Sequence, residues 1–215
     1  MNHISSLSAM LDGVIELKAI AKLYLIRHGC TKMNGSERCP DKIRGHIDVP
    51  LDDMGRLQAS RVAKRLVNKN IDHIYSSDLS RAHETAQIIS TRLGGVPVTP
   101  TEGLRPWNLG SEIEGHETRK VLPKIHRLID TPNRVPKDGE PMNEFRDRFM
   151  STMQAIRDMH PEGNVAVVTH LRGIQLLKSY DDEGYFRPNK FKSREGEPKP
   201  GGLEIIKNGP QPTLG

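Results

Sequence analysis

Cysteine is scarce in this chain of 215 residues. Cys30 and Cys39 are the only two cysteines, so the chain has neither a disulfide framework nor a Cys-x-x-Cys pair with zinc-finger spacing. This scarcity argues against a disulfide-stabilised secreted domain and against a zinc finger. We therefore expect a reduced, cytoplasmic setting.

Long apolar runs are also missing. The longest wholly apolar stretches, such as residues 165–168, fall far short of the ~20 residues that span a bilayer. The first 21 residues lack a basic start and carry Asp12 and Glu16 where a signal peptide is apolar. We expect neither a membrane partner nor a cleaved signal peptide. Apolar residues at helical spacing leave a partner-binding helix open here, beside a loosely attached extension or a start codon assigned upstream of Met10.

No block of one charge dominates the chain. Its 32 Lys and Arg residues and 27 Asp and Glu residues give a net charge of +5, and the basic residues are scattered. This pattern favours a small anionic molecule over a nucleic acid as the partner. The length suits one domain, with an N-terminal extension over residues 1–21 and a domain over 22–215. A monomer and a homodimer are both open.

From Lys22 onward, short β-rich segments alternate with longer segments of helical period, which is typical of an α/β domain with a largely parallel sheet. The expected strands are 23–26, 73–76, 96–99, 165–169 and 203–206. The expected helices are about 53–67, 79–93, 121–129, 145–159 and 173–180. The segments rich in Pro, Gly and Lys, expected to form surface loops, are 130–141 and 187–202.

Two of the predicted strands end in histidine. Arg27 and His28 close the first strand, and His170 closes the fourth. Ligands in open α/β sheets bind outside the carboxyl ends of the strands, so both histidines are expected at one edge. Arg81 follows the second strand and lies near the start of a helix, where free N–H groups favour an anion.

Two arginines and two histidines without acidic metal ligands indicate a phosphate pocket. Guanidinium groups bind phosphoryl oxygens with two hydrogen bonds and stay charged at any working pH. A histidine among such cations has a lowered pKa, so its neutral imidazole can attack phosphorus. The remaining histidines show no metal-ligand spacing, and we expect neither a metal nor a cofactor.

The chain also carries four motifs in a specific order. They are Arg27-His28-Gly29 with Thr31 and Asn34, the segment 43–51 with Gly55 and Ala59, the segment 75–82 with Thr85 and Ala86, and Thr169-His170 with Gly173. The combination resembles the histidine phosphatase superfamily, which includes the cofactor-dependent phosphoglycerate mutases. The resemblance covers about residues 22–206. It implies a three-layer α/β/α sandwich with a mostly parallel central sheet, and a metal-independent phosphatase that acts on a small phosphorylated metabolite.

The resemblance implies a role for each matching residue. His28 would be the nucleophile that becomes phosphohistidine. The residues that would hold the transferred phosphoryl group are Arg27, Arg81 and His170. The residues that would bind the substrate are Thr31, Asn34 and Arg44, although a solvated surface role for Arg44 is equally open.

One departure concerns the general acid. In the family this acid is usually a glutamate two residues after a leucine, but here Leu104 is followed by Pro106 at that place. Proline cannot transfer a proton. The nearest carboxylates are Glu102, Glu112, Glu114 and Glu117. We favour Glu112, because it follows a glycine at which the chain can turn back toward the pocket.

Two other functions stay open. A phosphoglycerate mutase would return the phosphoryl group to its substrate, but the compact stretch 115–163 favours a phosphatase. The missing glutamate also leaves open a weakly active or non-catalytic phosphoryl-binding protein. Among neighbouring residues, Cys30 is interpreted as a packing residue rather than a redox group, and Trp107 as a loop anchor or a substrate-stacking ring.

Overall fold

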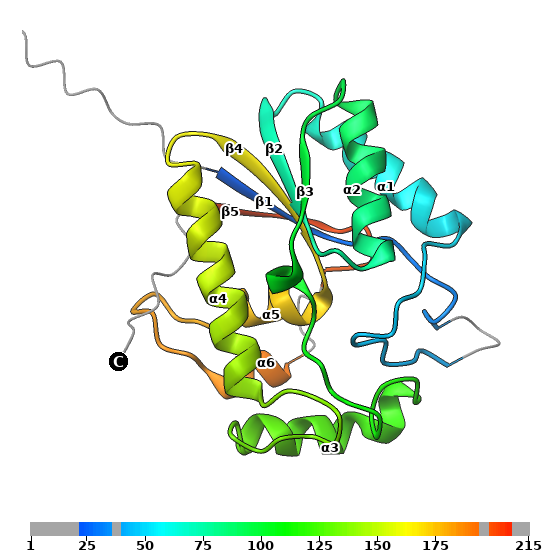
Figure 1. Ribbon diagram of the computed structural model, residues 1–215, viewed down its shortest axis with the longest axis vertical. Coiled ribbons are helices and arrows are strands. Elements are labelled where there is room, and N and C mark those ends of the chain that lie inside the picture. The colour runs from blue at the N-terminus through cyan, green and yellow to red at the C-terminus, as the bar shows by residue number, and fades with distance from the viewer. Residues whose placement is uncertain (1–21, 36–39, 194–197, 208–215) are drawn as a thin grey trace, which may run out of the picture.

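The computed structural model describes residues 22–35, 40–193 and 198–207. A five-stranded sheet of order β3-β2-β4-β1-β5 forms its centre (Figure 1). The strands are β1 (Lys22–Arg27), β2 (Ile71–Ser76), β3 (Val98–Pro100), β4 (Asn164–Thr169) and β5 (Leu203–Lys207). All neighbouring strands pair in parallel except β5, which is antiparallel to β1. The helices are α1 (Asp53–Leu66), α2 (Ser80–Arg92), the short 3-10 helix η1 (Glu102–Leu104), α3 (Thr118–Asp130), α4 (Met142–Met159), α5 (Leu171–Lys178) and α6 (Pro188–Lys192).

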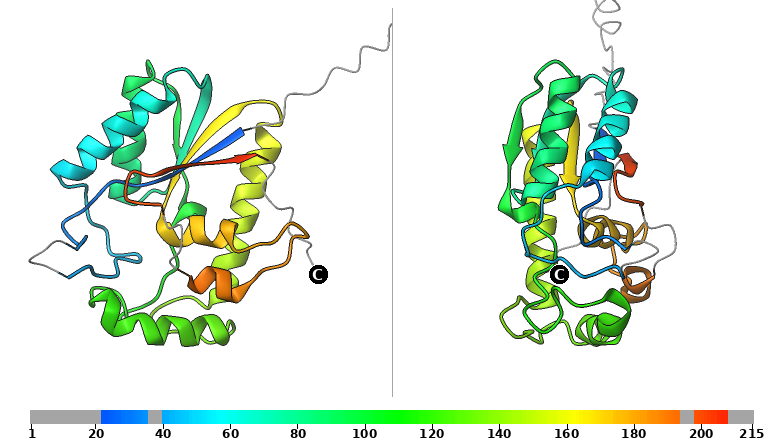
Figure 2. Two further views of the ribbon diagram at one scale, coloured as in Figure 1. Left: turned by 180° about the vertical axis from the view of Figure 1, so that it is seen from behind. Right: turned by 90° about the vertical axis from the view of Figure 1, so that its right-hand side faces the viewer.

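Helices cover both faces of the sheet. Side chains alternate along β1, so that Leu23 and Leu25 join the core under α3, α4 and α5, whereas Tyr24 and Ile26 join the core under α1 and α2. Figure 1 and the left view of Figure 2 show the molecule from the front and from behind. Both views place α1 and α2 together, with α4 on the other side of the strands. The expected three-layer α/β/α sandwich with a mostly parallel sheet is confirmed.

The predicted elements differ from the observed ones mainly near the C-terminus. Segment 187–202 was expected to be a loop, yet it contains α6. Phe191 of α6 is fully buried against the rings of Trp107 and Phe186. One buried ring in a five-residue helix gives no periodicity, so the sequence pattern missed it. The predicted extension 1–21 lies outside the described residues and stays a prediction.

The parallel strands bring several loops to one edge of the sheet. Arg27 and Thr169, the last residues of β1 and β4, are paired in register. The chain beyond this edge leads toward α3, which lies at the far end of the molecule in each view (Figures 1 and 2). Within the described ranges, no helix has the length and apolar character needed to cross a membrane.

Candidate active site

Two histidines face each other at the ends of β1 and β4. His28 follows β1, and its backbone N–H donates to the carbonyl of Thr169. His170 follows β4 and precedes the first turn of α5. The two ring centroids are 5.0 Å apart, and both side chains are almost fully buried. The register of two adjacent parallel strands therefore brings together residues that are far apart in the sequence.

A backbone carbonyl fixes which nitrogen of His28 is free to react. Nδ1 of His28 lies 2.7 Å from the carbonyl oxygen of Gly29. Because a carbonyl oxygen only accepts, Nδ1 carries the proton, and Nε2 keeps its lone pair. The imidazole is thus held in the tautomer that a nucleophile requires.

Three arginines surround the two rings. Arg27 Nη1 donates to the carbonyl of Pro198 at 2.8 Å. Arg81 reaches the pocket from the first turn of α2, and its two terminal nitrogens donate to the carbonyls of Gly45 and Ile47 at 2.8 and 2.9 Å. Arg44 lies on the same loop as these two carbonyls. Arg81 therefore ties the 44–47 loop to the pocket while bringing its own charge there.

Burial and these cations determine the charge of the site. Burial first, then Arg81, Arg27 and Arg44, lower the pKa of His28 well below its usual value. Burial and Arg81 do the same to the pKa of His170. Burial and Arg44 lower the pKa of Arg81 to about 9, which leaves its guanidinium protonated at neutral pH. The site therefore combines neutral imidazoles with charged guanidinium groups.

Several buried polar atoms of the site have no internal partner. Within the described part of the chain, neither ring nitrogen of His170 makes a hydrogen bond, and neither does Nε of Arg81. Leaving a buried donor unsatisfied costs about 1–3 kcal/mol, so native proteins rarely tolerate it without a reason. The Nε–H group of Arg81 and the single N–H group of the neutral His170 ring are suited to donate to the oxygens of an anion.

A close approach of two backbones supports the nucleophile. A Cβ added to Gly29 would lie 2.4 Å from the carbonyl oxygen of Gly55, at the start of α1. Gly29 is not among the residues with positive φ in the described chain, so its backbone conformation does not require a glycine. Close packing on α1 is the reason a glycine is needed beside His28.

The predicted substrate residues divide into two groups. Asn34 and Arg44 line the pocket. Thr31 is buried instead, and its N–H and hydroxyl group both donate to Oδ1 of Asn34, at 2.8 and 3.2 Å. The structure therefore places Thr31 behind Asn34 as a support for this loop, not in contact with the cavity.

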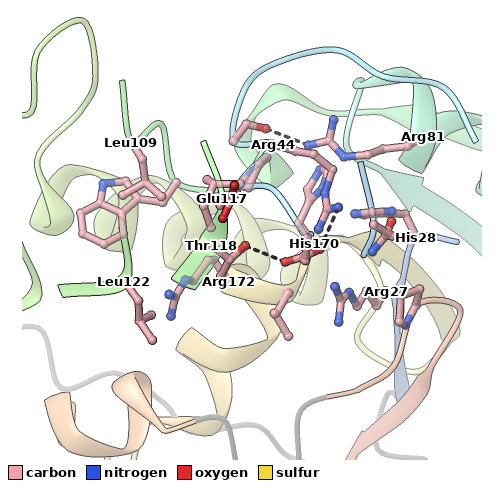
Figure 3. A pocket seen from close by; sticks show the side chains of 18 of the residues that line it. Arg27, His28, Arg44, Arg81, Leu109, Glu117, Thr118, Leu122, His170 and Arg172 are labelled. Atoms are coloured by element: carbon pink, nitrogen blue, oxygen red, sulfur yellow. Dashed lines mark hydrogen bonds and ion pairs between the residues drawn. The ribbon is translucent and has the colours of Figure 1, made fainter. Parts of the chain in front are cut away.

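The cavity has a volume of about 810 Å³ and two distinct ends. Figure 3 shows His28, His170 and the three arginines at one end. The residues labelled at the other end are Leu109, Glu117, Thr118, Leu122 and Arg172. We call the first the phosphoryl end and the second the outer end.

The structure does not bring Glu112 to the pocket. Its side chain is 62% exposed and lies 4.0 Å from Nζ of Lys124. Gly110 does turn the chain, with φ of +75°. However, the backbone N–H of the next residue, Ser111, donates to the carbonyl of Lys137 on a surface loop. The turn therefore leads to the surface and leaves Glu112 in solvent.

The other three proposed glutamates are held by partners. Glu102 is an exposed partner of Arg105. The carboxylate of Glu114 accepts from the backbone N–H groups of His46 and Leu109, both at 3.0 Å. Among the four, Glu117 alone lines the pocket, where it accepts from Lys120 Nζ at 2.7 Å and from Arg119 Nε at 3.2 Å.

Sequence reasoning overlooked most of the outer end. Arg172 of α5 lies at this end, and Arg119 of α3 and Lys192 of α6 also line the cavity. Arg172 lies two residues after His170, and this proximity in the sequence could have identified it as a cavity residue. The other two cations come from helices far away in the sequence, and no local pattern marks them. The ring of Trp107 is fully buried and stacks on Phe145, which favours its interpretation as a loop anchor over a substrate-stacking ring.

The buried histidines predict a specific pH dependence of stability. An unfolded histidine has a pKa near 6.5, whereas His28 and His170 have pKa values well below that in the folded state. As the pH falls below about 6.5, the unfolded chain takes up protons that the folded chain does not, so the free energy of unfolding decreases. Each histidine contributes at most about 1.4 kcal/mol per pH unit.

Denaturant unfolding at pH 7.5, 6.5 and 5.5 tests this expectation. His170→Asn should lose less stability on acidification than the wild type. His116→Asn is a matched control, because His116 is exposed. Equal pH dependence of wild type and His170→Asn would show that His170 is not held neutral.

Comparisons with known proteins agree with this geometry. The sequence model of the histidine phosphatase superfamily (branch 1) matches residues 23–181. Phosphoglycerate mutase-like protein 4 of Arabidopsis thaliana is 41% identical over 165 residues, which cover 73% of this chain and 69% of the relative.

Solved structures show the same fold. YhfR of Bacillus stearothermophilus matches with a TM-score of 0.70 and 30% sequence identity. The match covers 86% of this chain and 90% of the YhfR chain. An Escherichia coli protein described as a putative alpha-ribazole-5'-P phosphatase matches with a TM-score of 0.68 and 22% sequence identity. This match covers 87% of this chain and 90% of the Escherichia coli chain.

Proposed function

Because the chain belongs to the histidine phosphatase superfamily, we propose that it hydrolyses small phosphorylated compounds through a phosphohistidine at His28. The observation that carries this proposal is the state of His28. Its Nδ1 proton is held by the Gly29 carbonyl, its Nε2 is unprotonated, and burial among three arginines keeps the ring neutral. A neutral, oriented imidazole inside a cationic pocket is what an attack on a phosphoryl group needs.

The reaction has two steps. In the first, the Nε2 lone pair forms a bond to phosphorus, and the bond from phosphorus to the leaving oxygen breaks. Arg27 and Arg81 provide charge and hydrogen bonds for the phosphoryl oxygens in the transition state, and His170 provides a hydrogen bond. In the second step, water attacks the same phosphorus, and the electron pair of the N–P bond returns to Nε2.

A mutase is the second candidate, and the name of the Arabidopsis relative supports it. A mutase would return the phosphoryl group to an organic hydroxyl group instead of to water. Incubation with a phosphoglycerate and its bisphosphate separates the two reactions. A phosphatase releases inorganic phosphate, whereas a mutase interconverts the phosphoglycerates without net release.

Turnover of 4-nitrophenyl phosphate tests the proposal. Steady release of nitrophenol and of an equal amount of phosphate is the expected result. A protein that binds phosphate but releases no product from this or any other phosphate ester would be a phosphoryl-binding module, and the proposal would be wrong.

We expect activity to survive exhaustive treatment with a chelator. The arginines supply the positive charge that a metal ion supplies in many other phosphatases, and the neutral His170 can add a hydrogen bond. The measurement is the rate of nitrophenyl phosphate hydrolysis before and after chelation and dialysis. If the activity is lost and Mg²⁺ or Zn²⁺ restores it, the metal-independent mechanism fails.

A further inference from the structure

The charges around the cavity bear on which compounds the site can cleave. Six cationic and two carboxylate side chains line it within the described residues. The cations are Arg27, Arg44, Arg81, Arg119, Arg172 and Lys192. The carboxylates are Asp41 and Glu117. A leaving oxygen inside this cavity therefore experiences an excess of positive charge.

Both lining carboxylates already have partners. Asp41 lies 3.5 Å from Arg44 and accepts from the hydroxyl group of Thr118 at 2.6 Å. Glu117 accepts from Lys120 and Arg119, and the Lys120 hydrogen bond is the main cause that lowers its pKa. A general acid must be protonated before it acts, and cationic partners favour the opposite state.

Proline occupies the wall where the resemblance places a glutamate. Pro106 lines the cavity just beyond η1, and the carbonyl of Leu104 at the end of η1 accepts from the hydroxyl group of Thr169 at 2.9 Å. Thr169 directly precedes His170, so this wall is fixed beside the phosphoryl end. The carbonyl of Pro106 itself accepts a hydrogen bond from Nε2 of His46 at 3.0 Å. The proline ring offers no proton to a leaving oxygen.

We propose that this phosphatase acts on phosphoryl compounds whose leaving oxygen is weakly basic, such as acyl phosphates, phosphoanhydrides and aryl phosphates. This inference rests on the proposed function. As Nε2 of His28 forms the N–P bond, the P–O bond breaks, and the leaving oxygen keeps the electron pair as a carboxylate, phosphate or phenolate. No proton is transferred in this step. Arg44 near the phosphoryl end and Arg172 at the outer end supply positive charge for the departing anion.

The dependence of kcat/KM on leaving-group basicity tests this inference directly. This ratio reports the formation of the phosphoenzyme even when the second step limits kcat. The probes are substituted phenyl phosphates that range from 4-nitrophenyl to unsubstituted phenyl phosphate, together with acetyl phosphate, pyrophosphate and an alkyl phosphate. Acetyl phosphate and pyrophosphate distinguish acyl phosphates from phosphoanhydrides as the preferred class.

We expect kcat/KM to fall steeply as the leaving group becomes more basic, and the alkyl phosphate to react ~100- to 10,000-fold more slowly than nitrophenyl phosphate, the range that general acid catalysis supplies. A shallow dependence, with the alkyl phosphate comparable to nitrophenyl phosphate, would overturn the inference while leaving the phosphatase intact. Failure to cleave any of the compounds would overturn both.

Two variants at one position provide a gain-of-function test. Pro106→Glu introduces a carboxyl group at the cavity wall, and Pro106→Gln introduces the same shape without a transferable proton. We expect Pro106→Glu, compared with Pro106→Gln, to raise the rate on the alkyl phosphate relative to nitrophenyl phosphate. Equal ratios in the two variants would show that position 106 cannot donate to the leaving oxygen. The steep dependence in the wild type tests the inference even if neither variant folds.

Discussion

Replacing His28 with alanine should abolish turnover, with a loss on the order of 10⁵- to 10⁶-fold, as is typical when a catalytic nucleophile is removed. The substitution takes away the Nε2 lone pair that the Gly29 carbonyl keeps available. The remaining arginines still bind phosphate, so the variant should keep its affinity for inorganic phosphate. The measurements are the hydrolysis rate of nitrophenyl phosphate and the binding of phosphate by calorimetry.

His116→Ala is the matched control for this experiment. His116 is exposed, does not line the described cavity and should tolerate the change with full activity. A His28→Ala protein that is folded and still hydrolyses nitrophenyl phosphate within tenfold of the wild type would assign the nucleophile to another residue.

The second large effect is expected at His170. Its two ring nitrogens are buried without a hydrogen-bond partner in the described part of the chain, and its ring lies 5.0 Å from that of His28. One of these nitrogens is therefore available to donate to a phosphoryl oxygen in the transition state. Its removal in His170→Ala should lower kcat/KM ~100- to 1,000-fold, which corresponds to about 3–4 kcal/mol.

A conservative variant distinguishes a hydrogen bond from mere packing. His170→Gln keeps an N–H donor and should recover part of the activity, whereas His170→Ala should not. The loss in both variants should appear in kcat more than in KM, because the contact strengthens as charge develops on the transferring group. A His170→Ala enzyme within threefold of the wild type would exclude this role.

The sequence was most informative about the elements that carry the histidines. Strands β1 and β4 are short apolar runs whose last residues, Arg27 and Thr169, are each followed by a histidine, and the rule for parallel sheets places such ends at one edge. The structure places these residues side by side, and the fold predicted from the alternation of strands and helices is confirmed. The resemblance also suggested the matching positions of Arg44, Arg81 and Asn34, which all line the cavity.

The sequence was least informative about the carboxylates. The position of Glu112 depends on a hydrogen bond from Ser111 to Lys137, which turns its segment toward the surface. Glu114 is held by the backbone N–H of His46, 68 residues away. Such long-range contacts decide which side chain reaches a cavity, and no local spacing reports them. Arg119 and Lys192, which also line the cavity, were missed for the same reason.

Direct capture of the phosphoenzyme tests the central claim, which is that His28 accepts the phosphoryl group. The enzyme is mixed rapidly with radiolabelled acetyl phosphate or nitrophenyl phosphate, quenched in alkali, digested and mapped by mass spectrometry. The claim predicts a label that alkali preserves and acid removes, located at His28 and formed at least as fast as turnover. Turnover without such a label, or with the label on another residue, would contradict it.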